Sequence, residues 1–194
     1  MGMPATTEHY WLPADLEQIP EEAGHRYECI DGMLLVTPAP RMVHAAALAH
    51  LSLLIERGLK ADGHTPRVIT SRADLRPEPT TVVEPDLLVL RTRASAKTRL
   101  DDPACAVLIA EVLSPSTAKR DRGIKRVLYQ RVGVPEYWIV DLDARLIERW
   151  TPSDARAEIL RERLDWKDPV SGTELVLDVE QYFAEVWGDA SPAD

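Results

Sequence analysis

Two acidic residues stand inside apolar segments of the chain, where packing alone does not account for them. Asp86 lies in Val82–Leu90 (VVEPDLLVL), and Glu111 lies in Val107–Leu113 (VLIAEVL). An ionised carboxylate in an apolar setting is costly unless it shifts its pKa, finds a partner or binds a metal. Carboxylates on neighbouring strands make a hard-oxygen site suited to Mg²⁺ or Mn²⁺, which would take substrate phosphate oxygens as further ligands.

Lys125 lies on the segment that follows Glu111, which the sequence predicts to be helical. At 100° per residue its side chain falls at the border of the apolar stripe, from where it can lean over the end of the sheet. An ammonium group there would stabilise the charge that develops on a phosphoryl group. Together the three side chains predict metal-assisted hydrolysis of a phosphodiester bond. Two structural alternatives stay open: an arginine ion pair for Glu111, and an i,i+4 pair of Lys125 with Asp121.

The segments before Glu111 predict strands and one long helix. A hairpin over 29–37 turns at Asp31-Gly32, a dipeptide typical of two-residue turns. Apolar residues recur at spacings of three and four over 44–59, which predicts a helix. Extended segments are expected at 67–75 and 81–90, joined by a turn that contains proline.

The strand over 106–113 is the most apolar, so we expect it at the centre of the sheet. Ser114-Pro115 then opens a helix, with the hydroxyl as its cap and the proline in its first turn. Gly133 is a natural end for that helix. The inner stripe of the helix is predicted to comprise Ile124, Val127, Leu128 and Val132. Further strands are expected at 136–140, 145–150, 158–164 and 174–177, before a last helix at 179–186.

These elements predict one α/β domain over residues 1–194, because no repeat or linker divides the chain. Residues 1–25 are expected to lie along the surface, and the core to span about 26–150. Accessory strands and a helix are expected within 151–188. The core order is helix, three strands, helix, strand, with additional strands at both ends.

This order resembles the PD-(D/E)XK nuclease superfamily, whose pattern Pro85-Asp86 and Glu111 match. The chain is also similar to the Uma-type restriction endonuclease family over about residues 20–150. That resemblance rests on Tyr27–Gly32 (YECIDG), His44, Glu84–Asp86, Glu111–Thr117 (EVLSPST), Asp121, Lys125, Tyr129 and Gly133–Asp141 (GVPEYWIVD). It implies a restriction-endonuclease-like fold, with Asp86 and Glu111 as metal ligands.

One position departs from the superfamily pattern. The pattern has a lysine two residues after the acid, and this chain has Leu113 there. In the Uma-type family the lysine is found on the following helix. The resemblance therefore implies Lys125 as its replacement and as the group that stabilises charge.

Four further residues are candidates for the same site. Glu28 matches the family pattern and is either a third acid near the metal or an edge-strand residue that faces water. His44 either contacts the phosphate or a water, or is an ordinary polar residue of a first helical turn. Asp121 and Tyr129 share a side of the helix with Lys125 and are expected to support it.

Charge is unevenly distributed along the chain. The net charge is −9, but residues 91–131 carry ten basic and four acidic residues. A basic region on an acidic body can hold the phosphate backbone of DNA. A solvated helix face is the alternative interpretation.

The remaining composition narrows the class of protein. Hydrophobic residues make up 45% of the chain and charged residues 28%, which is typical of a globular protein. Cys29 and Cys105 are solitary, so neither a zinc site nor a disulfide framework is expected, and a cytoplasmic location fits. No run is long enough to span a bilayer.

We therefore expect an endonuclease that hydrolyses DNA with Mg²⁺ or Mn²⁺, as a homodimer and without a membrane partner. Two alternatives remain. One is a nuclease-like fold that binds nucleic acid or a protein without cutting. The other is a phosphodiesterase or phosphatase that acts on small phosphate esters with the same residues.

Overall fold

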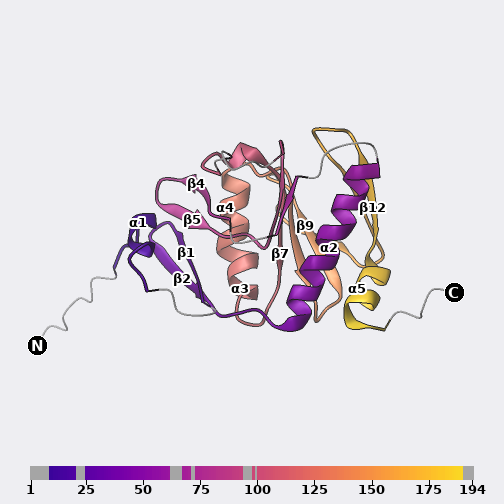
Figure 1. Ribbon diagram of the computed structural model, residues 1–194, viewed down its shortest axis with the longest axis horizontal. Coiled ribbons are helices and arrows are strands. Elements are labelled where there is room, and N and C mark those ends of the chain that lie inside the picture. The colour runs from indigo at the N-terminus through magenta and orange to yellow at the C-terminus, as the bar shows by residue number, and fades with distance from the viewer. Residues whose placement is uncertain are drawn as a thin grey trace, which may run out of the picture.

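A six-stranded sheet runs through the middle of the computed structural model, which describes residues 9–20, 25–61, 67–70, 73–93, 98 and 100–189 (Figure 1). Its strand order is β10-β9-β8-β7-β6-β3. Strand β7 pairs in parallel with β8 and antiparallel with β6, and all of its residues are buried, which confirms its predicted central place. The strands are β3 (Val68–Ile69), β6 (Leu87–Leu90), β7 (Ala106–Val112), β8 (Tyr137–Asp141), β9 (Leu146–Trp150) and β10 (Glu158–Leu160).

A second sheet, of four strands in the order β2-β1-β5-β4, lies to one side of the first (Figure 1). Its strands are β1 (Arg26–Ile30), β2 (Met33–Thr37), β4 (Leu75–Glu78) and β5 (Thr81–Val83). The predicted hairpin is confirmed as β1-β2, and Asp31 and Gly32 both have positive φ, 50° and 81°. Such φ values suit the twist of a two-residue hairpin turn. A Cβ on Gly32 would collide with the ring of Tyr10, and the positive φ also favours glycine at this position.

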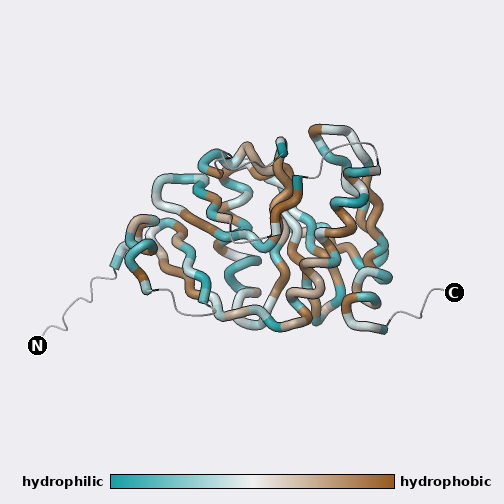
Figure 2. Tube along the Cα trace, in the orientation of Figure 1, coloured by the Kyte–Doolittle hydropathy of each residue, from teal (hydrophilic) through white to brown (hydrophobic). Residues whose placement is uncertain are grey.

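Helix α2 (Met42–Ala61) covers one face of the central sheet, together with α5 (Val179–Trp187) and the hairpin β11 (Arg163–Lys167)–β12 (Glu174–Asp178) (Figure 1). Leu51, Ile55 and Leu59 are buried on the predicted face of α2, and Leu48 is half-buried. Apolar residues concentrate along the central strands in Figure 2. No helix in the described part of the chain is long and apolar enough to cross a membrane.

The other face of the central sheet packs against the helical segment after β7 and against the four-stranded sheet. This segment comprises α3 (Ala118–Arg120), the π-helical turn η2 (Asp121–Lys125) and α4 (Arg126–Arg131). In Figure 1 it lies between the second sheet and the central strands. Two short helices complete the fold, α1 (Pro13–Leu16), which packs against β1, and η1 (Pro103–Cys105).

Several strands are shorter than the extended segments that the sequence predicts. The expected strand over 81–90 breaks after Val83, and β5 and β6 belong to different sheets. Pro85 has no N–H for a ladder bond, and Asp86 turns its backbone N–H toward a side chain instead. The segments 67–75 and 158–164 likewise contribute to two strands each.

The helix after β7 also differs from expectation. It begins at Ala118, after a turn over 115–117, and the Ser114 hydroxyl contacts the Thr117 hydroxyl within this segment. The predicted stripe was wrong at Val127, which is 47% exposed. The Arg126 N–H bonds to the Asp121 carbonyl five residues back, so the π-turn rotates the residues that follow. Gly133 ends the helix as expected, with φ of 75°.

Candidate active site

Glu111 reaches the site because of the alternation of side chains along β7. Successive residues of a strand point to opposite faces of the sheet. Ile109 and Leu113 pack on the α4 side, whereas Ala110 and Val112 pack on the α2 side. Glu111 therefore points toward α4 and is only 2% exposed.

Asp86 lies beside Glu111 at the point where β5 gives way to β6. Its N–H donates to Oε2 of Glu111 at 3.4 Å. Its Oδ2 accepts from the N–H of Val112 at 3.0 Å and lies 3.1 Å from Nε2 of His44. Its Oδ1 accepts from Nη1 of Arg26 at 2.9 Å. The break in the strand thus turns the Asp86 carboxylate against the end of β7.

Lys125, the last residue of the π-turn, contacts two of the acids, Glu111 and Glu28. Its Nζ lies 2.9 Å from Oε1 of Glu111 and 2.8 Å from Oε1 of Glu28. The Tyr129 hydroxyl donates to the same Glu111 oxygen at 3.2 Å. The partners of Lys125 are therefore two acids from two sheets. The expected alternative of an arginine ion pair for Glu111 is wrong, because its cation is Lys125.

Glu28 is part of this cluster. Strand β1 lies between β2 and β5, so Glu28 is not an edge-strand residue, and it is 1% exposed. Its Oε1 accepts from the N–H of Glu84 at 2.8 Å as well as from Lys125. The interpretation in which Glu28 faces water is therefore wrong.

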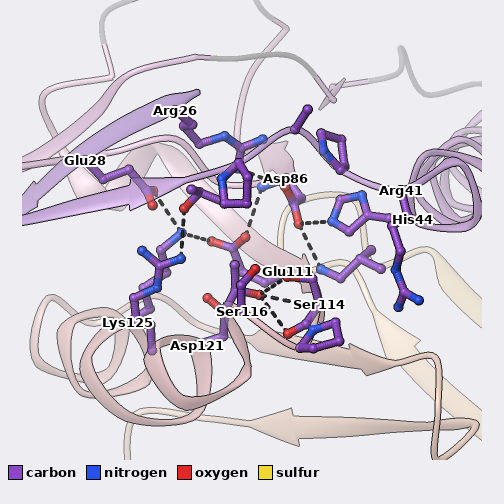
Figure 3. Close-up of a pocket in the computed structure, with 18 residues that line it drawn as sticks. Arg26, Glu28, Arg41, His44, Asp86, Glu111, Ser114, Ser116, Asp121 and Lys125 are labelled. Carbon is purple, nitrogen blue, oxygen red and sulfur yellow. Dashed lines mark hydrogen bonds and ion pairs between the residues drawn. The ribbon is translucent and has the colours of Figure 1, made fainter. Parts of the chain in front are cut away.

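These side chains line a pocket of about 540 Å³ (Figure 3). Of the candidates, Glu28, His44, Asp86, Glu111, Asp121 and Lys125 line it, and Tyr129 contacts Glu111 from outside the lining. Figure 3 shows Asp86 and Glu111 next to one another, with Lys125 and Glu28 to one side and His44 to the other. The mouth is bordered by the loop 37–41 and by the segment 114–117.

The pKa values of Glu111 and Asp86 shift in opposite directions, although burial raises both. Burial raises the pKa of Glu111 well above its usual value, and the carboxylates of Asp86 and Asp121 add to this, while Lys125 opposes it. Burial also disfavours ionised Asp86, but the bond from His44 and the charge of Arg26 outweigh it, so the pKa of Asp86 is lowered. Asp86 is the firmly ionised member of the pair.

The charge of Lys125 is held by its acidic neighbours. Burial lowers the pKa of Lys125, but the carboxylates of Glu111, Glu28 and Asp121 outweigh it and raise the pKa well above its usual value. Four buried acids (Glu28, Asp86, Glu111 and Asp121) line the pocket together with Arg26 and Lys125, while Arg41 and Arg120 lie at its border. The buried acids outnumber the two cations that contact them, Arg26 and Lys125.

The donor set fits a hard divalent cation that keeps waters and substrate as ligands. A carboxylate has about four lone-pair sites. Among the described residues, Glu111 Oε2 accepts one weak hydrogen bond, from the Asp86 N–H, and retains acceptor capacity, whereas Asp86 Oδ1 is contacted by the Arg26 guanidinium. Across the described ranges, no three His, Cys, Asp or Glu side chains are arranged as a metal cage. Two carboxylates suffice for Mg²⁺, which is usually bound by one or two of them together with substrate phosphates.

Arg26 was not predicted to belong to the site, although its position on β1 carries a signal. Arg26 and Glu28 stand two apart on β1, and residues two apart on a strand share a face. Arg26 also donates to the Glu84 carbonyl at 2.9 Å, so it joins the two sheets at the site. The alternation of side chains along β1 therefore predicts that Arg26 lies on the same face as Glu28.

The basic region 91–131 does not form one free surface. Arg122 bonds to Asp141 and Glu148 at 2.5 and 2.6 Å, and Arg131 bonds to Asp31 and Glu78. Arg122 and Arg131 are therefore neutralised within the protein. Arg120, by contrast, bonds within the described part of the chain to neutral groups on β2, the Val36 carbonyl and the Thr37 hydroxyl. Lys97 and Arg99 lie outside the described residues.

A family model described as "Uma2: Putative restriction endonuclease" matches residues 13–181. The chain belongs to the Uma2 family. A similar solved structure is from Anabaena variabilis ATCC 29413 and is described as "a putative nuclease belonging to DUF820". It superposes with a TM-score of 0.72 at 18% identity, covering 89% of this chain and 97% of the other. No curated protein matches the chain by sequence.

Membership of the Uma2 family, together with this fold, indicates a restriction-endonuclease-like nuclease of the PD-(D/E)XK type. The family implies hydrolysis of nucleic acid. The predicted family and fold class are confirmed.

Proposed function

We propose that this protein is an endonuclease that hydrolyses DNA phosphodiester bonds with Mg²⁺ or Mn²⁺. The observation that carries the proposal is the meeting of Asp86, Glu111 and Lys125, from β5–β6, β7 and the π-turn, in one pocket. A structural core does not need three charged side chains that are almost fully buried, whereas such groups are typical of active sites.

Asp86 and Glu111 are the proposed metal ligands, through Asp86 Oδ1 and Glu111 Oε2. When bound, the cation would polarise the scissile phosphate and lower the pKa of a bound water. His44 holds Asp86 by its other oxygen, and Tyr129 holds Glu111 by its other oxygen. Each proposed ligand would therefore be oriented by a hydrogen bond to its second carboxylate oxygen.

Lys125 is proposed to stabilise the negative charge of the phosphoryl group as the bond to water forms. An ammonium group has three N–H donors, and the two ion pairs to Glu28 and Glu111 use two of them. The remaining donor can bond to a phosphate oxygen. Because the side chain is already fixed, little reorganisation is needed when charge develops.

DNA is the proposed form of nucleic acid, and its phosphates can enter between the two borders of the pocket. Arg41 is exposed on one border, and Arg120 stands on the other beside the hydroxyls of Ser116 and Thr117. Because the partners of Arg120 among the described residues are neutral groups, its charge can attract an anion. Within the basic region 91–131, the proposed DNA contact is therefore Arg120 at the border of the pocket, and Arg41 adds a second cation from outside that region.

The test is cleavage of supercoiled plasmid DNA with Mg²⁺ or Mn²⁺, with a chelator as the negative control. We expect nicking or linearisation by the parent protein. Asp86→Asn, Glu111→Gln and Lys125→Ala should each reduce the rate by roughly 10²-fold or more, as loss of a group that stabilises the transition state does. If all three folded variants cleave like the parent, the site is assigned wrongly.

Two further measurements separate the alternatives. Isothermal titration with Mn²⁺ that detects no binding, together with retained DNA affinity, would support a binding module that does not cut. Turnover of nitrophenyl phosphate esters without plasmid cleavage would support an enzyme for small esters. Light scattering after size exclusion tests the proposed homodimer.

A further inference from the structure

Arg26 already occupies one of the two oxygens proposed to hold the cation. Its Nη1 lies 2.9 Å from Asp86 Oδ1 and the same nitrogen donates to the Glu84 carbonyl at 2.9 Å. Its Nε lies 3.6 Å from a carboxylate oxygen of Glu84. The guanidinium group is therefore placed as a positive charge at the edge of the acidic cluster.

The other acceptor sites of the two carboxylates are taken by groups that cannot easily leave. Asp86 Oδ2 is held by the backbone of Val112 and by His44. Glu111 Oε1 is held by Lys125 and Tyr129, which are both buried. Arg26 is the more exposed cation of the pair, with 19% of its side chain accessible compared with 5% for Lys125. It is the cation that can move.

We propose that Arg26 is an internal counterion that a divalent cation must displace from Asp86 Oδ1 to complete the site. In the metal-free protein Arg26 neutralises Asp86 and so reduces the repulsion among the buried carboxylates. On metal binding it leaves Asp86 and keeps its contacts with Glu84, which lies two residues before Asp86 in the connection from β5 to β6. Arg26 then stands at the pocket, where a phosphate can accept from its freed N–H.

This inference rests on the proposed metal site, and it makes a prediction that the proposed function does not. If Arg26 competes with the metal, removing it should tighten metal binding. If Arg26 only orients Asp86 for the metal, removing it should weaken metal binding. The two roles therefore differ in sign.

The test is isothermal titration of Mn²⁺ into the full-length parent and into Arg26→Met. Methionine keeps an unbranched side chain but removes the charge and the hydrogen-bond donors. We expect Arg26→Met to bind Mn²⁺ roughly ten- to a hundred-fold more tightly, because the cation no longer has to break a charge-assisted hydrogen bond. Arg41→Met is the matched control. It removes one positive charge from the same pocket without removing a carboxylate contact, and should change affinity by only a few-fold.

Equal or weaker Mn²⁺ binding by Arg26→Met would overturn the proposal. A second measurement separates displacement from a general effect of charge, and it also decides the matter if Arg26→Met does not fold. A crystal of the parent protein soaked in Mn²⁺ should show Arg26 Nη1 beyond hydrogen-bonding distance of Asp86 Oδ1. An intact contact beside bound Mn²⁺ would overturn the proposal.

Plasmid cleavage is scored separately, so the two ideas can fail independently. A parent protein that cleaves DNA and binds Mn²⁺, with Arg26→Met binding no more tightly, would refute only the displacement. If neither protein binds Mn²⁺, both the metal site and the displacement are refuted.

Discussion

Lys125 Nζ lies 2.9 Å from Glu111 Oε1, and both side chains are almost fully buried. Removing one partner of a buried ion pair leaves an uncompensated charge, which is more damaging than the loss of the attraction itself. The same lysine also neutralises Glu28. Lys125 therefore stabilises the fold as well as the site, and this dual role affects how its variants behave.

Lys125→Met should lower the free energy of unfolding by about 3–5 kcal/mol, because two buried carboxylates lose their cation. Urea denaturation at pH 7 measures this. Lys119→Met is the control, since Lys119 is exposed on the same helical segment and should change stability by less than about 0.5 kcal/mol. Adding Glu111→Gln to Lys125→Met should recover part of the loss. Additive effects of the two substitutions would contradict the coupling.

Tyr129→Phe should weaken the hold on Glu111 without changing the pocket lining. The lost hydrogen bond goes to a charged group, so the expected cost is about 1.5–3 kcal/mol. Because Glu111 becomes less well oriented, Mn²⁺ affinity should also fall. Tyr182→Phe is the control. The Tyr182 hydroxyl bonds to the Ala47 carbonyl, and neither residue lines the pocket, so this variant should leave Mn²⁺ affinity unchanged. Unchanged affinity in Tyr129→Phe would mean that Tyr129 is purely structural.

Much of the site was predictable because each residue violates a local pattern. Glu111 is the single charge in a buried strand, and Asp86 interrupts an apolar run. The hairpin was predictable from Asp31-Gly32, because two positive φ values are costly for most other pairs. These signals are local, and local signals can be read from the chain.

The remaining features depend on contacts between distant segments. The π-turn at Asp121–Lys125 has no local signal in the chain, and a helical projection at 100° per residue assumes that no such turn occurs. This is why Val127 was predicted to be buried and is exposed. The split of 81–90 between two sheets depends on β1, which pairs with β5 from more than fifty residues away.

Gly32→Ala should destabilise the protein by roughly 1–3 kcal/mol, since a Cβ at this positive φ is strained and would collide with the Tyr10 ring. Gly123→Ala is the matched comparison. Open space surrounds Gly123 and its φ is not positive, so alanine should be neutral or stabilise by about 0.4–1 kcal/mol. Thermal unfolding of the two variants measures the contrast. Equal effects would contradict the need for glycine in the hairpin turn.

Asp168 supports a further prediction, away from the pocket. It follows β11 and pairs with Arg67 at the start of β3, so it ties the C-terminal hairpin to the edge of the central sheet. Burial alone would raise the pKa of Asp168, but the Ser171 hydroxyl, the Val170 N–H and Arg67 together lower it. A carboxyl with a lowered folded pKa stabilises the protein above its unfolded pKa, and this contribution is lost as the pH falls.

Asp168→Asn should therefore cost about 3 kcal/mol at pH 7, because Arg67 loses its buried partner. The difference from the parent should stay constant down to about pH 5 and shrink below the unfolded pKa of about 3.9, where the parent also becomes protonated. Urea denaturation from pH 7 to pH 3 follows this, with Asp143→Asn, at an exposed position, as the control. A difference that persists undiminished at pH 3 would mean that Asp168 acts through its hydrogen bonds, independently of its charge.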